Sequence, residues 1–422
     1  MTEVENRPVI VDMFCGSGGE SQGINWAVEK AGIEIEMFAI NHWERAIETH
    51  QANFPDAEHI CRSVSDINPS DVVPDRKIAL LWASPACTHF SNARGGKPRE
   101  DQSRVTPFTV LDWLDKLTVD RVIIENVPEF QSWGPLDPET HRPIQQVKGE
   151  TFRAYITMIQ GLGYDIDWKI LNAADYGAPT TRRRLFIQAA RTGSGKSILW
   201  PEVTHIQPGP NRLLTGDLPP WVPARDIIDW SLPTQIIDER NRPLAMNTMK
   251  RILRGIEKYW GEYARPFLVR YNGGENRVHT VGNSLPVLDT SDRYGLVQPL
   301  VMCIGQTSSK GRVRSVDEPL ATVVTKEEAC LIEPLFIPQH SCGEVRPTTG
   351  PLSTALITPE NVRLGFRMLK PHELASAQSF PRDYIFTGNR GEIVRQIGNA
   401  VCPKMAEALT SGYMQELAGV TA

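Results

Sequence analysis

Apolar runs of the length of buried β-strands, each followed by a polar loop, recur through the first 190 residues. They lie at 9–14, 35–40, 78–82, 121–124, 165–171 and 185–190. Between them, apolar positions recur with helical spacing at 24–31, 109–117 and 151–162. This alternation predicts an α/β domain with a Rossmann-like, mostly parallel sheet and helices on both faces.

Two of the predicted strands end in residues that can carry chemistry. Cys87 follows the run 78–82 in a polar, glycine-containing loop, and Glu125 and Asn126 follow the run 121–124. Because α/β sheets place their reactive groups just past the carboxyl ends of strands, a thiol and a carboxyl group are expected to share one cleft. The alternative is that Cys87 is a small buried apolar residue, as most lone cysteines are.

The first predicted strand runs into a glycine-rich turn with glycines at 16, 18, 19 and 23. Glycine lets the backbone approach a ligand closely, and the N-terminus of the helix that follows offers free N–H groups. The Gly-Lys-Ser/Thr ending of a phosphate loop is missing from this turn. A dinucleotide-type fold stays open on spacing alone, beside a tight turn that holds no ligand.

The second predicted strand ends at Asn41, His42 and Trp43. In a Rossmann-like sheet this position holds a ribose, usually through a carboxylate. Trp43 is expected either to stack on a flat base or to belong to the core.

Two basic segments flank the same predicted sheet. Residues 182–184 are three consecutive arginines before the run 185–190. Burying such charges at the start of a strand costs free energy unless some of them face anions or carbonyl groups. The polar and basic loop 96–104 is expected to be a solvated loop or a lid over the cleft.

Beyond residue 190 the composition changes, and prolines crowd between 201 and 223. A pattern of strand, glycine-rich turn and strand begins at Pro266, Pro299 and Pro334, with spacings of 33 and 35 residues. It predicts a smaller β-rich module with three approximate strand-turn-strand repeats, which either has a binding role or only packs. Polar and basic residues of its turns suit phosphates or guanine edges; they are Asn276, Arg277, Lys310, Arg312 and Arg346.

Length and composition narrow the class of protein. A chain of 422 residues is too long for one compact core, and no apolar run is long enough to span a membrane. The N-terminus lacks the zones of a signal peptide, and seven cysteines without a Cys-x-x-Cys pair fit reduced thiols in a cytosol. The net charge of −5 weakly disfavours a nucleic-acid partner. Nucleic-acid binding depends on a locally basic surface, however, and not on the net charge of the chain.

Six ordered motifs in 9–188 and 363–412 resemble those of the C5 cytosine-DNA methyltransferases, which use S-adenosylmethionine. They lie at 12–19 with Gly23, at 86–91, 125–127 and 182–184, at 367–373 with Gln378, Phe380 and Pro381, and at 396–401. The resemblance implies a catalytic domain at 1–195, a target-recognition domain at 196–362, and a return to the catalytic domain at 363–422.

The resemblance also implies a set of catalytic roles. The thiolate of Cys87 adds to carbon 6 of a flipped cytosine, which lets carbon 5 attack a sulfonium methyl group. Glu125, with Asn126 beside it, faces N3 of the ring, Arg184 holds the carbonyl O2, and Arg182 supports the thiol side.

Further site residues follow from the same resemblance. The expected cofactor-binding residues are Asp12, Phe14, Gly16, Gly18, Gly19, Asn41, His42, Trp43, Ser63, Val64, Pro85, Asn399, Ala400 and Val401. The expected DNA-binding residues are Ser91, Arg94, Lys97, Arg277, Lys310, Arg312 and Arg346. No metal is expected. The partner is double-stranded DNA and not a membrane, and we expect a monomer in the cytoplasm of a bacterial or phage-infected cell.

This sequence departs from the family pattern at several positions. Ala86 and Thr88 replace a proline and a glutamine on either side of the cysteine, and Thr180 replaces a glutamine. Asn41 and Ser63 stand where carboxylates usually hold the ribose and adenine of the cofactor.

Two alternatives share the catalytic domain. One is an RNA cytosine methyltransferase, which the long recognition module disfavours. The other is a catalytically inactive regulatory or DNA-binding paralogue, which the retained Cys87, Glu125, Arg182 and Arg184 disfavour. The sequence does not specify the DNA site, or whether the protein belongs to a restriction system or a phage or acts alone.

Overall fold

The computed structural model describes residues 7–74, 76–85, 106–135, 137, 139, 144–207, 217–233, 235–243 and 365–419, and the strands between 267 and 368. The chain divides into two compact units. The first comprises Met1–Val222, Ala321–Lys326 and Leu374–Ala422, and the second Pro223–Leu320 and Glu327–Glu373. The predicted domains 1–195, 196–362 and 363–422 stay a prediction, because most of 244–361 lies outside the described residues.

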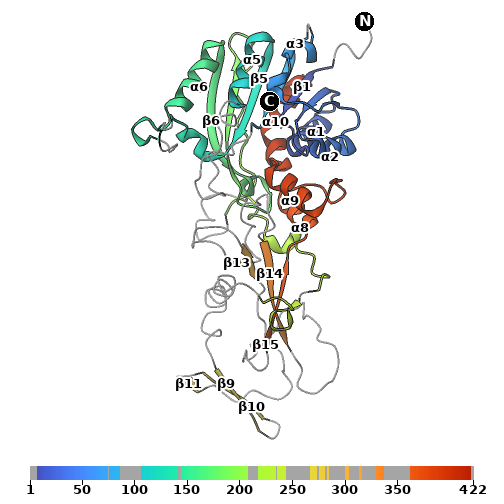
Figure 1. The fold of residues 1–422 in the computed structure, drawn as a ribbon, viewed down its shortest axis with the longest axis vertical. Helices are drawn as coiled ribbons and strands as arrows, with labels where there is room; N and C mark the ends of the chain where they lie inside the picture. The colour runs from blue at the N-terminus through green and yellow to red at the C-terminus, as the bar shows by residue number, and fades with distance from the viewer. Residues whose placement is uncertain are drawn as a thin grey trace. The chain divides into compact units, whose positions relative to one another are not determined.

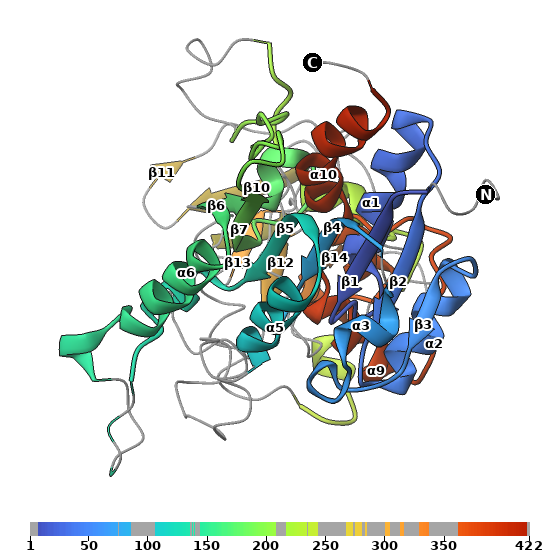
Figure 2. The same ribbon diagram turned by 90° about the horizontal axis from the view of Figure 1, so that it is seen from above.

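The described strands of the first unit form one seven-stranded sheet (Figure 1). Their order is β3-β2-β1-β4-β5-β7-β6 (Figure 2). The strands are β1 Val9–Met13, β2 Glu36–Ile40, β3 Glu58–Ile60, β4 Ile78–Ala83, β5 Val119–Asn126, β6 Tyr164–Asn172 and β7 Arg183–Arg191. All neighbouring pairs from β3 to β5 are parallel, whereas β7 is antiparallel to both β5 and β6. The predicted Rossmann-like, mostly parallel sheet is confirmed.

Helices cover both faces of this sheet (Figure 2). Apolar side chains of α1 and α10 pack with Ile10, Leu80 and Ile123 on one face. Those of α5 and α6 pack with Val11 and Leu81 on the other face. The helices of this unit are α1 Gly19–Ala31, α2 Glu44–Asn53, α3 Pro69–Val72, α5 Thr109–Lys116, α6 Glu150–Gly161, α9 Arg390–Asn399 and α10 Pro403–Leu417.

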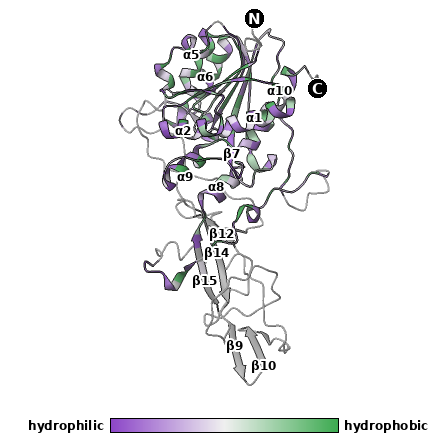
Figure 3. Cartoon of the chain, turned by 90° about the vertical axis from the view of Figure 1, so that its right-hand side faces the viewer, coloured by the Kyte–Doolittle hydropathy of each residue, from purple (hydrophilic) through white to green (hydrophobic). Residues whose placement is uncertain are grey.

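The helices that cover the sheet are amphipathic. Both α5 and α6 carry hydrophobic residues on part of their circumference and hydrophilic ones elsewhere (Figure 3). The hydrophobic residues include Trp113 and Tyr155, which are at most 1% exposed. One face of each helix is therefore committed to the core.

The reversed strand β7 decides what meets at the carboxyl edge of the sheet. In the β5–β7 register, Asn126 lies opposite Leu185 and Glu125 opposite Phe186. The end of β5 and the start of β7 are therefore at the same edge. The arginines at 182–184 reach this edge only because β7 runs against β5.

The second unit contains β-strands in two sheets, of order β11-β10-β9 and β13-β12-β14-β15-β8. The strands are β8 Gln235–Ile236, β9 Phe267–Asn272, β10 Glu275–Thr280, β11 Asn283–Ser284, β12 Leu300–Cys303, β13 Val313–Ser315, β14 Ala329–Phe336 and β15 Val362–Met368. Strands β9 and β12 begin one residue after Pro266 and Pro299, as expected, whereas Pro334 lies near the end of β14 and not at the start of a strand. The three strands do not occupy equivalent places, because β9 is in one sheet while β12 and β14 are neighbours in the other.

One predicted turn of this module is shorter than expected. Strand β10 pairs directly with β9, with Glu275 opposite Asn272 and Arg277 opposite Arg270. Only Gly273 and Gly274 separate the two strands in sequence. Arg277 therefore belongs to a strand and not to a turn.

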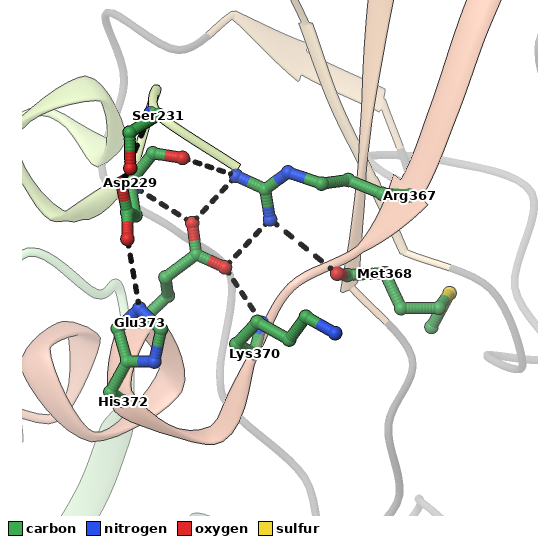
Figure 4. A network of polar contacts seen from close by, with 7 residues as sticks. All are labelled: Asp229, Ser231, Arg367, Met368, Lys370, His372 and Glu373. Atoms are coloured by element: carbon green, nitrogen blue, oxygen red, sulfur yellow. Dashed lines mark hydrogen bonds and ion pairs between the residues drawn. The ribbon is translucent and has the colours of Figure 1, made fainter. Parts of the chain in front are cut away.

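A buried ion pair joins the end of β15 to the start of α8, Pro371–Ala377. Both terminal nitrogens of Arg367 donate to the carboxylate of Glu373 at 2.8 Å (Figure 4). The backbone N–H groups of Asp229 and Lys370 donate to the same carboxylate at 2.8 and 2.6 Å. Arg367 is 8% and Glu373 0% exposed, so the segment that resembles the ninth motif has a structural role here.

No helix in the described part of the chain combines the length and the apolar character that crossing a membrane requires.

Candidate active site

The loop after β4 begins beside the end of β5. The side-chain amide of Asn126 donates to the carbonyl oxygen of Pro85 at 3.3 Å, and both residues are buried. Cys87 follows Pro85 by two residues in the sequence. Cys87 itself lies outside the described residues, as do Ser91, Arg94 and Lys97.

Glu125 and Arg184 form an ion pair at this edge. The Nε atom of Arg184 lies 2.9 Å from Oε1 of Glu125, and the side chains are 15% and 10% exposed. Arg184 also donates to the carbonyl of Arg183 at 2.8 Å. The pair holds a carboxyl group and a guanidinium side by side where the loop with Cys87 begins.

Arg182 is more deeply buried than Arg184, at 3% exposure. It donates at 3.1 Å to the carbonyl of Gly398, in the last turn of α9, where helix carbonyl groups favour a cation. Burial and then the charge of Arg184 lower the pKa of Arg182 to about 9. Arg182 thus links the predicted catalytic edge to the segment with Asn399, Ala400 and Val401.

The glycine-rich turn lies against that segment. Gly18 has a φ of 84°, a left-handed conformation that precedes α1 and favours glycine. A Cβ atom on Gly19 would lie 2.2 Å from the carbonyl oxygen of Val401 and 3.1 Å from Cβ of Ala400. Only glycine at 19 lets α1 begin this close to the residues before α10.

Asn41 and Trp43 have partners of their own in the structure. The Oδ1 atom of Asn41 accepts from the backbone N–H of Trp43 at 2.9 Å, where α2 begins. The guanidinium of Arg395 lies over the ring of Trp43, 4.5 Å from its centroid. One acceptor of Asn41 and one face of Trp43 are therefore already used by the protein.

The other predicted cofactor residues differ in exposure. Ser63 is partly exposed and its hydroxyl lies 2.8 Å from that of Ser65, while Val64 is buried. His42 and Asn399 are exposed. Their assignment to the cofactor stays a prediction.

Comparison with known proteins assigns the family. The sequence-family model of the C-5 cytosine-specific DNA methylases matches residues 9–414. The chain belongs to this family. It is an enzyme of the DNA (cytosine-5-)-methyltransferase class, whose members use S-adenosylmethionine.

Relatives of this DNA methylase span nearly its whole length. It is 25% identical to the Type II methyltransferase M.SacI of Streptomyces achromogenes, over 97% of this chain and 93% of the other. It is also 25% identical to the Type II methyltransferase M1.HphI of Haemophilus parahaemolyticus, over 96% of this chain and 86% of the other. Its fold is similar to a mutant of Spodoptera frugiperda DNMT2, with a TM-score of 0.51, 16% identity, and 96% and 99% of the two chains covered.

The DNA methylase also has a buried polar cluster that sequence reasoning missed. Glu20, in the first turn of α1, is 2% exposed and lies beside Asp12, which is 0% exposed. Burial raises the pKa of Asp12 to about 8, and burial together with the charge of Asp12 raises the pKa of Glu20 well above its usual range. The signal that could have revealed it is a glutamate directly after the paired glycines, where a helix begins against the sheet.

Proposed function

We propose that this protein transfers the methyl group of S-adenosylmethionine to carbon 5 of a cytosine in a specific double-stranded DNA sequence. The ion pair of Glu125 and Arg184, beside the segment that leads to Cys87, is the observation that carries the proposal. The Type II methyltransferases among its relatives support a DNA substrate. We further propose that it acts as a monomer in the cytoplasm of a bacterial or phage-infected cell.

The chemistry explains why a thiol is needed at Cys87. Carbon 5 of cytosine is a poor nucleophile, and addition of the Cys87 thiolate to carbon 6 converts the ring into an enamine. Carbon 5 would then take the methyl group as the bond between that group and the sulfonium sulfur breaks, which leaves a thioether. Loss of the carbon 5 proton to a base would then let the thiolate leave. A thiolate suits both steps because it is a strong nucleophile and a good leaving group.

Glu125 and Arg184 act on the polar edge of the base in this proposal. Glu125 donates or accepts a hydrogen bond at N3, where charge develops when the thiolate adds. Contacts within the described residues use Nε and one Nη1 hydrogen of Arg184, so other donors can hold the carbonyl O2. The ion pair keeps the two groups side by side before the base arrives, which reduces the reorganisation needed in the transition state.

Arg182 is a positioning residue in this scheme. Its bond to Gly398 ties the start of β7 to the end of α9, and with it Arg184 to the expected cofactor segment. The target base lies inside a duplex, so it must be flipped out at a cost of roughly a few kcal/mol. The basic loop with Ser91, Arg94 and Lys97 is proposed to close over it.

The residues around the glycine-rich turn fit the cofactor. Asp12 Oδ1 is buried and has no hydrogen-bond partner within the described residues, and a Cβ on Gly16 would approach no atom closer than 3.9 Å. The turn therefore offers both an acceptor and room. When bound, S-adenosylmethionine supplies an electrophilic methyl group on a sulfonium. The proposed binding residues are Asp12, Phe14, Gly16, Gly18, Gly19, Asn41, His42, Trp43, Ser63, Val64, Pro85, Asn399, Ala400 and Val401.

A covalent trap tests the nucleophile and the substrate together. Duplex DNA with 5-fluorocytosine at the target should form a stable adduct with the protein when S-adenosylmethionine is present, because fluorine cannot leave as a proton does. Cys87→Ser should form no adduct and lose activity by roughly several orders of magnitude, since a serine hydroxyl is hardly ionised at neutral pH.

Three outcomes would contradict the proposal. An adduct that persists in Cys87→Ser would show another nucleophile. Methylation of transfer RNA but not of duplex DNA would show an RNA methyltransferase. Binding of DNA without methyl transfer, under conditions in which the cofactor binds, would show an inactive paralogue.

A further inference from the structure

A continuous chain of hydrogen bonds runs from Asp12 towards the surface of the first unit. The hydroxyl of Ser21 donates to Oδ2 of Asp12 and lies 2.9 Å from Nε2 of His50. Nδ1 of His50 lies 2.8 Å from Nε2 of His59. Asp12, Ser21 and His50 are 0% exposed, whereas His59, in β3, is partly exposed.

The buried end of this chain holds two acids. Glu20 packs beside Asp12. Burial raises the pKa of both acids, and the charge of Asp12 raises the pKa of Glu20 further, whereas a hydrogen bond with Glu20 partly offsets the rise at Asp12. The titratable and charged groups that face the two acids come from several elements. They are Cys15, Glu125, Arg182, Tyr384, His50 and, through Cys15, Cys61.

We propose that Ser21, His50 and His59 are positioning residues for the cofactor, which carry a proton from Asp12 to the surface so that the carboxylate meets the cofactor's positive charge. This inference rests on the proposed use of S-adenosylmethionine at the glycine-rich turn. It assigns to the two histidines and the serine a role in discriminating S-adenosylmethionine, which carries a sulfonium charge, from its product S-adenosylhomocysteine, which does not.

The transfer moves one proton along each link of the chain. Before the transfer, the protonated carboxyl group of Asp12 donates to Ser21, and Ser21 donates to Nε2 of His50. The O–H bond of Asp12 breaks as its proton passes to Ser21, and the Ser21 proton passes to Nε2 of His50. Ser21 then donates to the Asp12 carboxylate, which is the direction seen in the structure. The Nδ1 proton of His50 passes to Nε2 of His59, and His59 gives a proton to water. At the end, Asp12 is a carboxylate, Ser21 is again a neutral hydroxyl, and each histidine is neutral with its proton on the other ring nitrogen. One proton has left the protein.

The two histidines suit such a relay. Burial, and then the neighbouring His59, lower the pKa of His50 to about 3, so its ring stays neutral with one donor and one acceptor nitrogen. Burial also lowers the pKa of His59. A neutral imidazole can pass a proton along without holding a lasting charge in the core.

The acids are linked to the edge where methyl transfer is proposed. Glu20 forms a hydrogen bond with Ser84, which follows β4, and interacts with the charge of Glu125 at the end of β5. A methyl donor must bring its sulfonium towards the base that Glu125 holds. The charge that distinguishes S-adenosylmethionine from S-adenosylhomocysteine therefore arrives near Asp12 and Glu20.

This linkage sets the direction of the pH dependence. Burial raises the pKa of Asp12 to about 8 without the cofactor, so Asp12 is mostly protonated below that pH. If S-adenosylmethionine binds only the carboxylate form, its binding below that pH releases a proton. Affinity for S-adenosylmethionine should rise with pH, by at most about tenfold per unit, and level off above about pH 8. Affinity for S-adenosylhomocysteine, which has no sulfonium, should change much less.

Two measurements test the relay on the full-length protein. Calorimetry at pH 7 in buffers of different ionisation enthalpy counts protons; we expect about one proton released with S-adenosylmethionine and close to none with S-adenosylhomocysteine. Nitrogen-15 NMR of labelled histidine reports the tautomer of His50, assigned by its loss in His50→Gln. We expect the Nδ1–H tautomer without ligand and the Nε2–H tautomer with S-adenosylmethionine.

A variant separates this role from a merely structural one. Ser21→Ala should weaken S-adenosylmethionine binding about tenfold and S-adenosylhomocysteine binding less than about twofold, because a hydrogen bond to the carboxylate is lost. The matched control is Thr410→Ala, which removes another buried hydroxyl, one that donates to Ala406 in its own helix, and should change neither affinity.

The outcomes distinguish this inference from the proposed function. If both ligands bind with equal proton release and His50 keeps one tautomer, the relay is wrong while the cofactor assignment stands. Equal weakening of both ligands by Ser21→Ala would also overturn the relay. If neither ligand binds to the wild-type protein, the proposed function itself fails.

Discussion

The buried ion pair of Arg367 and Glu373 allows a sharp test of what holds the end of β15 in place. Glu373 accepts four hydrogen bonds, two from Arg367 at 2.8 Å and two from the backbone N–H groups of Asp229 and Lys370. In Glu373→Gln, one acceptor oxygen becomes an NH2 group that faces donors, and the buried guanidinium of Arg367 loses its counter-charge. Breaking such a pair costs about 3–5 kcal/mol.

Hydrogen exchange of the β15 amides measures this loss locally, because β15 pairs with β14 and β8 in the same unit. The expected change is exchange that is faster by roughly 10²- to 10⁴-fold. The double variant with Arg367→Met and Glu373→Met should lose less than the single variant, because no buried charge is left without a partner.

A surface pair provides the control for this test. Lys116 and Asp112 lie 2.9 Å apart in α5, with side chains 43% and 48% exposed. Asp112→Asn should change exchange in α5 by less than about threefold, since exposed pairs contribute roughly 0–1 kcal/mol. Exchange in β15 that changes by less than tenfold in Glu373→Gln would refute the role given to the buried pair.

The other predictions concern the cofactor and DNA surfaces. Gly19→Ala should cost about 1–3 kcal/mol of stability in urea unfolding, because its Cβ would lie 2.2 Å from the Val401 carbonyl, while Gly161→Ala, with open space around it, should be neutral. Asn41→Asp or Ser63→Asp should tighten S-adenosylmethionine binding by up to about 1–2 kcal/mol in calorimetric titration, since a carboxylate accepts stronger hydrogen bonds; weaker binding in both would contradict their placement. Replacing one of four basic residues should leave cofactor binding intact and weaken DNA binding. A residue that contacts a phosphate should lower the salt slope of DNA binding by about one, and a residue that contacts a base should cost roughly 1–3 kcal/mol at one base pair. Unchanged affinity and site preference in all four variants would exclude these residues from the DNA-binding surface. These residues are Arg277, Lys310, Arg312 and Arg346.

Local pattern was enough to predict most strands of the sheet and the helices beside them. The run at 9–14 became β1, the glycines after it became the turn before α1, and the helical spacing at 109–117 became α5, Thr109–Lys116. These features depend on the spacing of apolar positions and on the backbone freedom of glycine, which neighbouring residues decide. The position of Glu125 at a strand end could be predicted for the same reason.

What the sequence could not decide are contacts between residues far apart in the chain. Arg184 meets Glu125 only because β7 runs against β5, and the pattern of apolar residues does not specify strand order or direction. The relay of Asp12, Ser21 and His50 depends in the same way on how α1 and α2 pack over the sheet. A buried charge looks the same in sequence as an exposed one, so its partners become visible only when tertiary packing removes the water around it.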